Sequence, residues 1–323
     1  MFFCVKMGLK CEILMSNAKG VYRPGQSVDG VVKYTVTEPM EVTSVTLSMI
    51  GRGLCCWAPL ISYVGTLYTG TEDFVNHCSI LQQARGNETM FIQPGIYEQP
   101  FSFMLPNGIP SSYKDIRCFI AYFIQLKFGK PNTNLLSFSK KFIAEFRVQG
   151  DRKPLLQNNI TCQLAKNFLM QNKGVNFVAH IAKPIVNAGE DIVIALNINN
   201  EAEVNILAIK TEIIKYVTYK SDCDHEKKRS KVVNATEIKY DTKKDETQLI
   251  VPTTPELQSI YSNIFIKEYK VRVTLKFPFP HTEASLELPV VIVANNYDVD
   301  VDLDDQPPPY WQVMNEKKGE GLD

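Results

Sequence analysis

The chain has 323 residues, of which 45% are hydrophobic and 22% are charged, a balance that is typical of globular proteins. Its 35 Lys and Arg residues equal its 35 Asp and Glu residues, so the formal net charge at pH 7 is zero. Because nucleic-acid binding needs an excess of positive charge, this neutrality argues against a nucleic acid as partner. The length favours two domains, each large enough to bury its own core.

The amino-terminal residues are largely apolar, but Lys6 and Lys10 interrupt them too early for the core of a signal peptide. No stretch reaches the roughly 18–20 apolar residues that a membrane-spanning helix needs. We therefore expect a cytoplasmic protein with no transmembrane segment, in which the eight cysteines stay reduced. The cysteines form no C-x-x-C pair, so we expect neither a zinc site nor another cofactor.

In the first half of the chain, apolar and polar residues alternate with a period of two. Val45, Leu47 and Met49 alternate with serine and threonine, and longer runs of the same kind occupy residues 118–128 and 141–149. This period is that of a β-strand with one buried and one wetter face, as in antiparallel sheets.

The alternation returns in the second half, at residues 191–199, 270–277 and 286–293. Gly, Pro, Asn and Asp separate the runs, and no regular helices intervene, which favours β-sandwiches over a parallel α/β sheet. The segments 24–28 and 188–192 each place a glycine turn just before a strand, as two related domains in tandem would. The sequence therefore predicts an all-β protein with two tandem immunoglobulin-like β-sandwich domains.

We predict four parts along the chain, divided at a polar break near residue 150 and at the end of the strand pattern. They are an N-terminal sandwich (1–150), a linker with an entering strand (151–171), a C-terminal sandwich (172–296) and a flexible acidic tail (297–323). The tail carries Asp at every second position from Asp298 to Asp304 and then three prolines, a composition that cannot build a packed core.

Several turn and strand motifs resemble those of arrestins. Residues 22–30 are similar to the family's early Y-x-x-G-x-x-[VI]-x-G motif, and residues 94–106 resemble its central PG-x-[HY]…F-x-F-x-LP segment. In the second half, residues 189–200 resemble the opening of the second arrestin domain, and residues 271–292 resemble its closing hairpin. The resemblance spans about residues 5–296 and implies that both sandwiches are arrestin-like.

The sequence Pro307-Pro308-Pro309-Tyr310 is a PPxY motif, which within the arrestin family is a hallmark of the alpha-arrestins. Three successive prolines fix φ near −65° and so pre-form a polyproline II rod. The resemblance implies that Pro307 and Pro308 fill the proline groove of a WW domain and that Tyr310 fills its tyrosine pocket. The alternative is a solubilising tail with an accidental run of prolines.

The densest basic run of the chain lies between Glu226 and Lys231. Its cations, Lys227, Lys228, Arg229 and Lys231, could contact acidic phospholipid headgroups at a membrane surface. The alternative, which the neutral overall charge favours, is a solvated hairpin loop after a strand that ends near Tyr219.

The adjoining segment from Asp222 to His225 combines two acids, a thiol and an imidazole, which invites an interpretation as a metal or nucleophile site. Two neighbouring carboxylates repel a thiolate, and no second cluster of ligands lies nearby, so we predict a polar loop. No motif of a nucleophilic, metal-dependent or nucleotide-binding enzyme occurs in the chain. We therefore predict no enzymatic activity, no catalytic residue and no metal ligand.

Three functions remain open at this point. The resemblance implies an adaptor whose tail recruits WW-domain HECT-type ubiquitin ligases to transmembrane cargo proteins, promoting ubiquitination, endocytosis and protein transport. Such an adaptor would be cytoplasmic, with peripheral membrane association through recruitment to the plasma membrane and endosomes. The second function is a trafficking scaffold that works without a ligase, and the third is a redox or metabolic regulator that binds thioredoxin.

Overall fold

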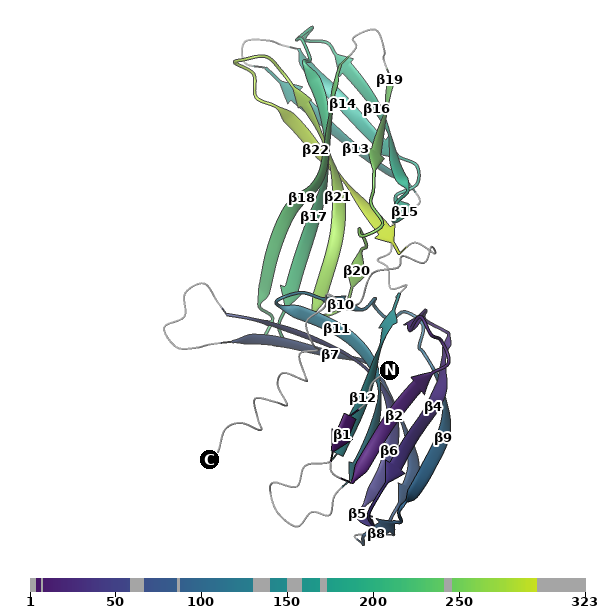
Figure 1. Ribbon diagram of the computed structural model, residues 1–323. Coiled ribbons are helices and arrows are strands. Elements are labelled where there is room, and N and C mark those ends of the chain that lie inside the picture. Colours follow the sequence, from purple (N-terminus) through teal and green to yellow (C-terminus); the bar gives the residue numbers. More distant parts are fainter. Residues whose placement is uncertain are drawn as a thin grey trace.

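The computed structural model describes residues 4–6, 8–58, 67–85, 88–129, 140–149, 159–168, 173–240 and 246–294, of which 4–6, 140–146 and 246 are described as backbone only. Every regular element in these ranges is a strand. Figure 1 shows the strands as two sandwiches stacked end to end, the first half of the chain below and the second half above. The predicted all-β fold with two tandem sandwiches is confirmed.

The first domain contains two sheets and a short two-stranded pair. The four-stranded sheet has the order β1 (Cys4–Lys6), β2 (Leu9–Met15), β4 (Ser27–Val36) and β9 (Gly95–Met104). The larger sheet has the order β3 (Val21–Tyr22), β12 (Lys140–Val148), β11 (Cys118–Gly129), β6 (Ser44–Trp57) and β7 (Tyr68–Gln83), with β10 (Tyr113–Lys114) paired to β11. The short pair is β5 (Met40–Val42) with β8 (Met90–Ile92).

The second domain repeats this topology. Its four-stranded sheet has the order β13 (Ile160–Asn167), β14 (Gly174–Ile181), β16 (Asp191–Asn200) and β19 (Glu246–Pro252). Its larger sheet has the order β15 (Ile185–Asn187), β22 (Ala284–Val293), β21 (Phe265–Lys276), β17 (Ala208–Lys220) and β18 (Glu226–Lys239), with β20 (Ile260–Tyr261) paired to β21. Apart from the short pair of the first domain, the two strand orders correspond one to one along the chain, as expected of related domains in tandem.

The glycine turns that precede β4 and β16 show the conformation that their sequence favours. Gly25 has a φ of 78° and Gly189 a φ of 89°, a region that side chains with a Cβ rarely adopt. The β13 strand lies within the segment that the sequence assigns to the linker and entering strand, and it pairs with β14 over its whole length. The exact domain boundaries stay a prediction.

The buried side chains follow the period of two. Val45, Leu47 and Met49 in β6 are at most 1% exposed, while the residues between them are partly exposed. In β16, Ile192, Ile194 and Leu196 are all fully buried, and the alternate positions face water. Each sandwich therefore has the apolar interior that its strand pattern predicts.

The core of the first domain continues into the second. Val217 and Tyr219 of β17, together with Ile260, Ile264 and Phe265, are buried in the same apolar cluster as the interior of the first sandwich. Figure 1 shows the lower ends of β17 and β21 meeting β7, β10 and β11 at this point. The two domains are therefore joined by packed side chains as well as by the chain itself.

Candidate functional site

The PPxY motif follows the second domain in sequence. Pro307, Pro308 and Tyr310 lie outside the described residues, so their roles stay a prediction. The last strand, β22, ends at Val293, where the Ser259 N–H donates a hydrogen bond of 2.7 Å to the Ile292 carbonyl. The neighbouring Gln258 in turn donates to the Ser111 hydroxyl of the first domain. The chain therefore leaves the second sandwich beside the domain junction.

The basic run lies on a strand and not in a loop, so the loop interpretation was wrong. Lys227, Lys228, Arg229 and Lys231 all belong to β18, which pairs with β17 from Lys220↔Glu226 onward. This strand is the edge of the larger sheet of the second domain. Lysine is a common residue on such edges, because a charged side chain hinders pairing with a second chain.

The strand alternation divides the four cations between two faces. Lys227, Arg229 and Lys231 stand opposite inward-facing positions of β17, whereas Lys228 stands opposite Thr218, whose side chain points to the other face. The sequence suggests one cluster of four cations, but Lys228 lies on the other face of β18 from Lys227, Arg229 and Lys231. A lipid contact through these residues stays a prediction.

Acidic neighbours offset part of the charge of the basic run. Glu226 lies 2.8 Å from Lys228 and 3.5 Å from Lys220. The hydrogen bond to Glu226 raises the pKa of Lys228, and the same bond lowers the pKa of the Glu226 carboxyl. The positive character of this edge is therefore concentrated on the face that carries Lys227 and Arg229.

The segment from Asp222 to His225 is the polar turn between β17 and β18, as the sequence predicts, and it also contacts the first domain. The Asp222 N–H donates to the Thr69 carbonyl at 2.9 Å, and the Asp222 carboxylate accepts the Thr71 N–H at 3.0 Å. The His225 ring stacks on Tyr68 with 4.1 Å between the ring centroids. Asp222 and His225 of this turn therefore join the edge of one domain to the edge of the other.

A half-buried carboxylate at the junction, that of Asp115, accepts hydrogen bonds from both domains. The Tyr219 hydroxyl of the second domain donates to Asp115 Oδ2 at 2.6 Å, and the Tyr113 hydroxyl donates to the same oxygen at 3.0 Å. The N–H groups of Arg117 and Cys118 both donate to Asp115 Oδ1 at 2.7 Å. Four donors on one carboxylate fix its position.

A buried lysine lies beside this carboxylate. Lys267 of β21 is only 9% exposed, and its ammonium lies 5.1 Å from the centroid of the Tyr113 ring. Burial, followed by repulsion from Lys215, lowers the pKa of Lys267 from 10.5 to about 8. The ring of Tyr113 also stacks on Phe265 at 4.3 Å, so aromatic and charged contacts join the domains at the same place.

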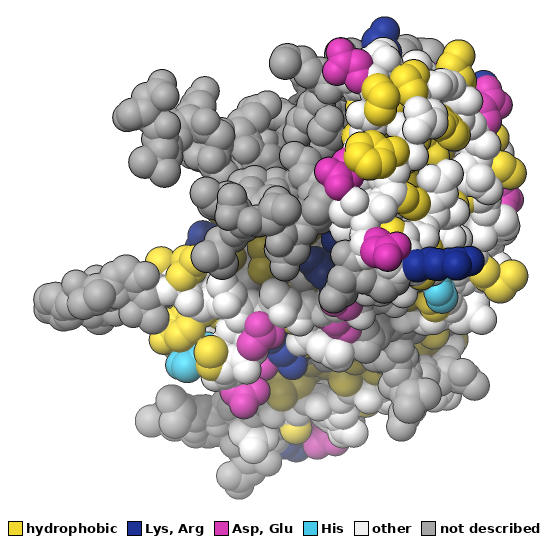
Figure 2. Space-filling model, turned by 90° about the horizontal axis from the view of Figure 1, so that it is seen from below, with side chains coloured by type: hydrophobic (Ala, Val, Ile, Leu, Met, Phe, Trp, Pro, Cys, Tyr) yellow, Lys and Arg dark blue, Asp and Glu magenta, His cyan; other side chains and the backbone are white. Residues whose placement is uncertain are grey.

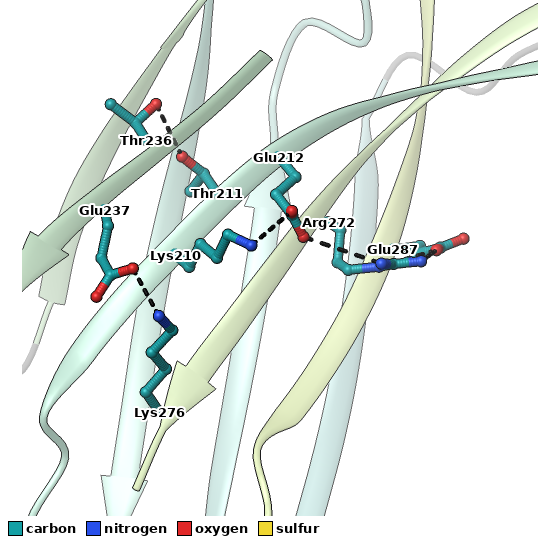
Figure 3. A network of polar contacts seen from close by, with 8 residues as sticks. All are labelled: Lys210, Thr211, Glu212, Thr236, Glu237, Arg272, Lys276 and Glu287. Atoms are coloured by element: carbon teal, nitrogen blue, oxygen red, sulfur yellow. Dashed lines mark hydrogen bonds and ion pairs between the residues drawn. The ribbon is translucent and has the colours of Figure 1, made fainter. Parts of the chain in front are cut away.

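A second polar network ties the strands of the larger sheet of the second domain together (Figure 3). Arg272 donates to Glu287 Oε1 through Nη2 at 2.8 Å and approaches Glu212 at 3.9 Å. Lys210 pairs with Glu212 at 2.7 Å. Burial raises the pKa of Glu287, but the hydrogen bonds from Arg272 and Tyr216 outweigh it, so the pKa of this carboxyl stays below 4.5. This network links β17, β21 and β22 and therefore stabilises the larger sheet of the second domain.

The described surface offers neither a metal centre nor a helix that could cross a membrane. Within the described ranges, no group of three or more His, Cys, Asp and Glu side chains is placed to hold a metal ion. No helix long and apolar enough to span a bilayer occurs in that part of the chain either. Seen from below, the described surface mixes apolar, acidic and basic side chains (Figure 2).

Taken together, the described residues define a class of protein. Two sandwiches of the same topology share a packed and hydrogen-bonded junction, and the chain leaves the second one beside that junction. The geometry is that of a tandem β-sandwich protein whose two domains share one junction.

Comparison with known proteins narrows this class to one family. The family profile described as Arrestin (or S-antigen), N-terminal domain, matches residues 11–151, and that described as Arrestin (or S-antigen), C-terminal domain, matches residues 171–297. Both domains are thus matched in order, and the chain belongs to the arrestin family, within the group of arrestin domain-containing proteins.

The relatives are distant and longer than this chain. Arrestin domain-containing protein B of Dictyostelium discoideum is 23% identical over 274 residues, covering 83% of this chain and 44% of its own length. Arrestin domain-containing protein 4 of Mus musculus is 24% identical, covering 64% and 52%, and arrestin domain-containing protein 17 of Caenorhabditis elegans is 26% identical, covering 65% and 52%. The chain spans about half the length of the relatives that it matches.

The junction residues Asp115, Tyr219 and Lys267 did not emerge from the sequence. Tyr219 and Lys267 occupy inward positions of regular strands, where the alternation predicts only core packing. One signal was present, because a lysine on the apolar face of β21, between Phe265 and Tyr269, breaks the strand pattern.

Proposed function

We propose that this protein is a non-enzymatic adaptor that brings a WW-domain HECT-type ubiquitin ligase to transmembrane cargo proteins. The ligase binds the tail through Pro307, Pro308 and Tyr310, and the sandwiches bind the cargo. Ubiquitination of the cargo then promotes its endocytosis and transport. The observation that carries the proposal is a PPxY motif directly after two arrestin domains.

The physical case rests on the stiffness of the motif and the length of its tether. A polyproline II rod loses little backbone entropy on docking, so a short peptide can bind with an affinity on the order of micromolar. Pro307 is 14 residues beyond Val293, so a fully extended chain would separate these two residues by at most about 50 Å. A ligase on the motif is therefore held close to any cargo on the second sandwich.

This sequence carries one PPxY motif, so the affinity proposed here is that of a single motif. Cargo and ligase have to hold the complex together through separate surfaces. Peripheral contact with a membrane, through Lys227, Arg229 and Lys231, would add a third point of attachment and place the protein at the plasma membrane and endosomes.

Proximity labelling in cells, with the intact chain and with the Tyr310→Ala variant, tests the proposal. We expect WW-domain ligases to be lost from the labelled proteins of the variant and membrane proteins to be retained. Pro309→Ala is the matched control, because the x position of PPxY faces no pocket. Equal labelling of ligases by the intact chain and by Tyr310→Ala would favour a trafficking scaffold that works without a ligase.

A further inference from the structure

Two cysteines of the first domain face each other across neighbouring strands. Cys55 of β6 and Cys118 of β11 are paired residues in the sheet, and their Sγ atoms lie 2.6 Å apart. This separation is far shorter than an ordinary contact between two sulfur atoms, although it is longer than the roughly 2.05 Å of a disulfide bond. Both side chains are buried, since Cys55 is 0% exposed and Cys118 is 2% exposed.

The register of the strands places this pair where a cross-strand disulfide fits. The Cys56 N–H donates to the Arg117 carbonyl at 2.7 Å, which makes Cys56 and Arg117 a hydrogen-bonded pair. Hydrogen-bonded and non-hydrogen-bonded pairs alternate along an antiparallel ladder, so Cys55 and Cys118 form a non-hydrogen-bonded pair. The Cα atoms of such pairs are about 4.5 Å apart, within the range of about 4.4–6.8 Å that disulfides accept.

We propose that Cys55 and Cys118 form a reversible disulfide when the protein meets a low-molecular-weight disulfide such as oxidised glutathione. One cysteine attacks the small disulfide and forms a mixed disulfide, releasing one small thiol. The second cysteine then displaces the other small thiol. Two protein S–H bonds are lost and one protein S–S bond forms, while the S–S bond of the oxidant is reduced to two S–H bonds.

The surroundings of the pair couple this reaction to the domain junction. The Cys55 Sγ lies 3.4 Å from the carbonyl of Ile264 in the second domain, so that domain covers the sulfur. Burial raises the pKa of the Cys118 thiol, which keeps it protonated and unreactive while the junction is closed. The Cys118 N–H also donates a hydrogen bond to Asp115, the carboxylate that accepts the hydrogen bond from the Tyr219 hydroxyl. The disulfide therefore forms when the junction opens, and its presence shows that the junction has been open.

The chain offers built-in controls for a test. Cys78 and Cys223 are exposed, so replacing both by Ser removes two thiols that would compete for the oxidant. Cys56 is the sequence neighbour of Cys55, but its side chain points to the opposite face of β6 and is only partly buried. The variants Cys56→Ser and Cys55→Ala therefore differ by one position along the strand and by the side of the sheet.

The experiment uses the full chain with Cys78→Ser and Cys223→Ser, treated with oxidised glutathione, unfolded in an alkylating reagent and digested without reduction. We expect a cross-linked peptide pair that contains Cys55 and Cys118, is two hydrogens lighter than its parts and disappears with a reducing agent. The cross-link should persist in Cys56→Ser and be lost in Cys55→Ala. The oxidised protein should melt about 5 °C higher than the reduced one, as disulfides of this kind commonly achieve.

Alkylation of both Cys55 and Cys118 after exhaustive oxidation would overturn the proposal, and so would a cross-link that survives Cys55→Ala. Cys118→Ala gives a second test if Cys55→Ala does not fold. The peptide map of the protein that keeps both Cys55 and Cys118 tests for the disulfide without either variant. A faster cross-linking rate in Tyr219→Phe, whose junction lacks one hydrogen bond, is the result expected if opening controls access.

Discussion

The Tyr219 hydroxyl of the second domain donates a 2.6 Å hydrogen bond to the Asp115 carboxylate of the first. These two residues are 104 positions apart in the chain, and Tyr219 belongs to an apolar cluster to which both domains contribute. A charge-assisted bond in such surroundings is stronger than one in water. This bond is one of the specific contacts that join the two sandwiches.

Removing this contact should loosen the junction. We expect Tyr219→Phe to lower the free energy of unfolding by about 1.5 kcal/mol, because a hydrogen bond to a charged group is lost while the ring still packs. Tyr113→Phe is the matched control, since it removes a bond to the same oxygen from within the first domain. Hydrogen exchange around residues 260–265 should quicken in Tyr219→Phe and not in Tyr113→Phe. Equal exchange in both variants would show that the bond does not hold the domains.

A glycine in β7 allows the domains to approach each other closely. A Cβ atom at Gly70 would lie 2.1 Å from the Lys220 carbonyl oxygen of the second domain, a distance that backbone atoms cannot accommodate. We expect Gly70→Ala to cost about 1–3 kcal/mol in the free energy of unfolding, as overpacked sites do. In Gly95→Ala, where the added Cβ meets only the Tyr97 ring at 3.6 Å, chemical denaturation should show a much smaller change. Similar losses in both variants would contradict a close approach at Gly70.

The buried lysine at the junction should make stability depend on pH in an unusual direction. The folded-state pKa of Lys267 is lowered to about 8, so between about pH 8 and 10.5 the unfolded chain binds more protons than the folded one. The contribution of Lys267 to stability therefore rises with pH across this window and is least favourable below it. We expect Lys267→Met to be more stable than the parent at pH 7 by on the order of 1–3 kcal/mol.

Urea denaturation of Lys267→Met and the parent at pH 7 and pH 9.5 measures this effect. The advantage of the variant should shrink at the higher pH. An advantage that is unchanged between the two values would mean that Lys267 keeps its ordinary pKa in the folded protein.

The ion pair between Arg272 and Glu287 should matter only above the acidic range. The folded-state pKa of Glu287 is lower than 4.5, so its stabilising contribution is present above that value and is lost as the pH falls through the lower folded-state pKa. We expect Arg272→Met to lose about 1 kcal/mol at pH 7 and less at pH 3. Lys276→Met, which breaks the more exposed pair with Glu237, should cost less at pH 7. A loss in Arg272→Met that grows on acidification would refute this assignment.

The fold was predictable where apolar residues alternate strictly. Val45, Leu47 and Met49 were expected to face a core and are buried, because a strand that is covered on one face leaves a period of two in its sequence. The turns at Gly25 and Gly189 were also predictable, since few residues other than glycine adopt a positive φ.

The edge strand β18 was missed because its sequence lacks that period. All its residues from Lys228 to Val232 are exposed, and an edge strand has a neighbour on one side only. Without a buried face, a basic strand and a basic loop look alike in sequence. The junction was missed for a different reason, because Asp115 and Tyr219 meet only through the packing of two domains, which no local pattern encodes.

The candidate ligase-binding site, unlike the junction, was assigned from the sequence alone. The roles of Pro307 to Tyr310 were assigned from the PPxY pattern and the resemblance to alpha-arrestins, and no contact of the described residues adds to that assignment. The family assignment supports the adaptor scaffold, and the proposed ligase partner rests on the motif alone.

Titration of a single WW domain of a HECT-type ligase into the full chain, the Pro309→Ala variant and the Tyr310→Ala variant tests the central claim most directly. We predict a dissociation constant on the order of micromolar for the full chain, a change of no more than about threefold in Pro309→Ala, and a loss of at least about tenfold in Tyr310→Ala. Undiminished binding by Tyr310→Ala, or no binding by the full chain, would contradict the account.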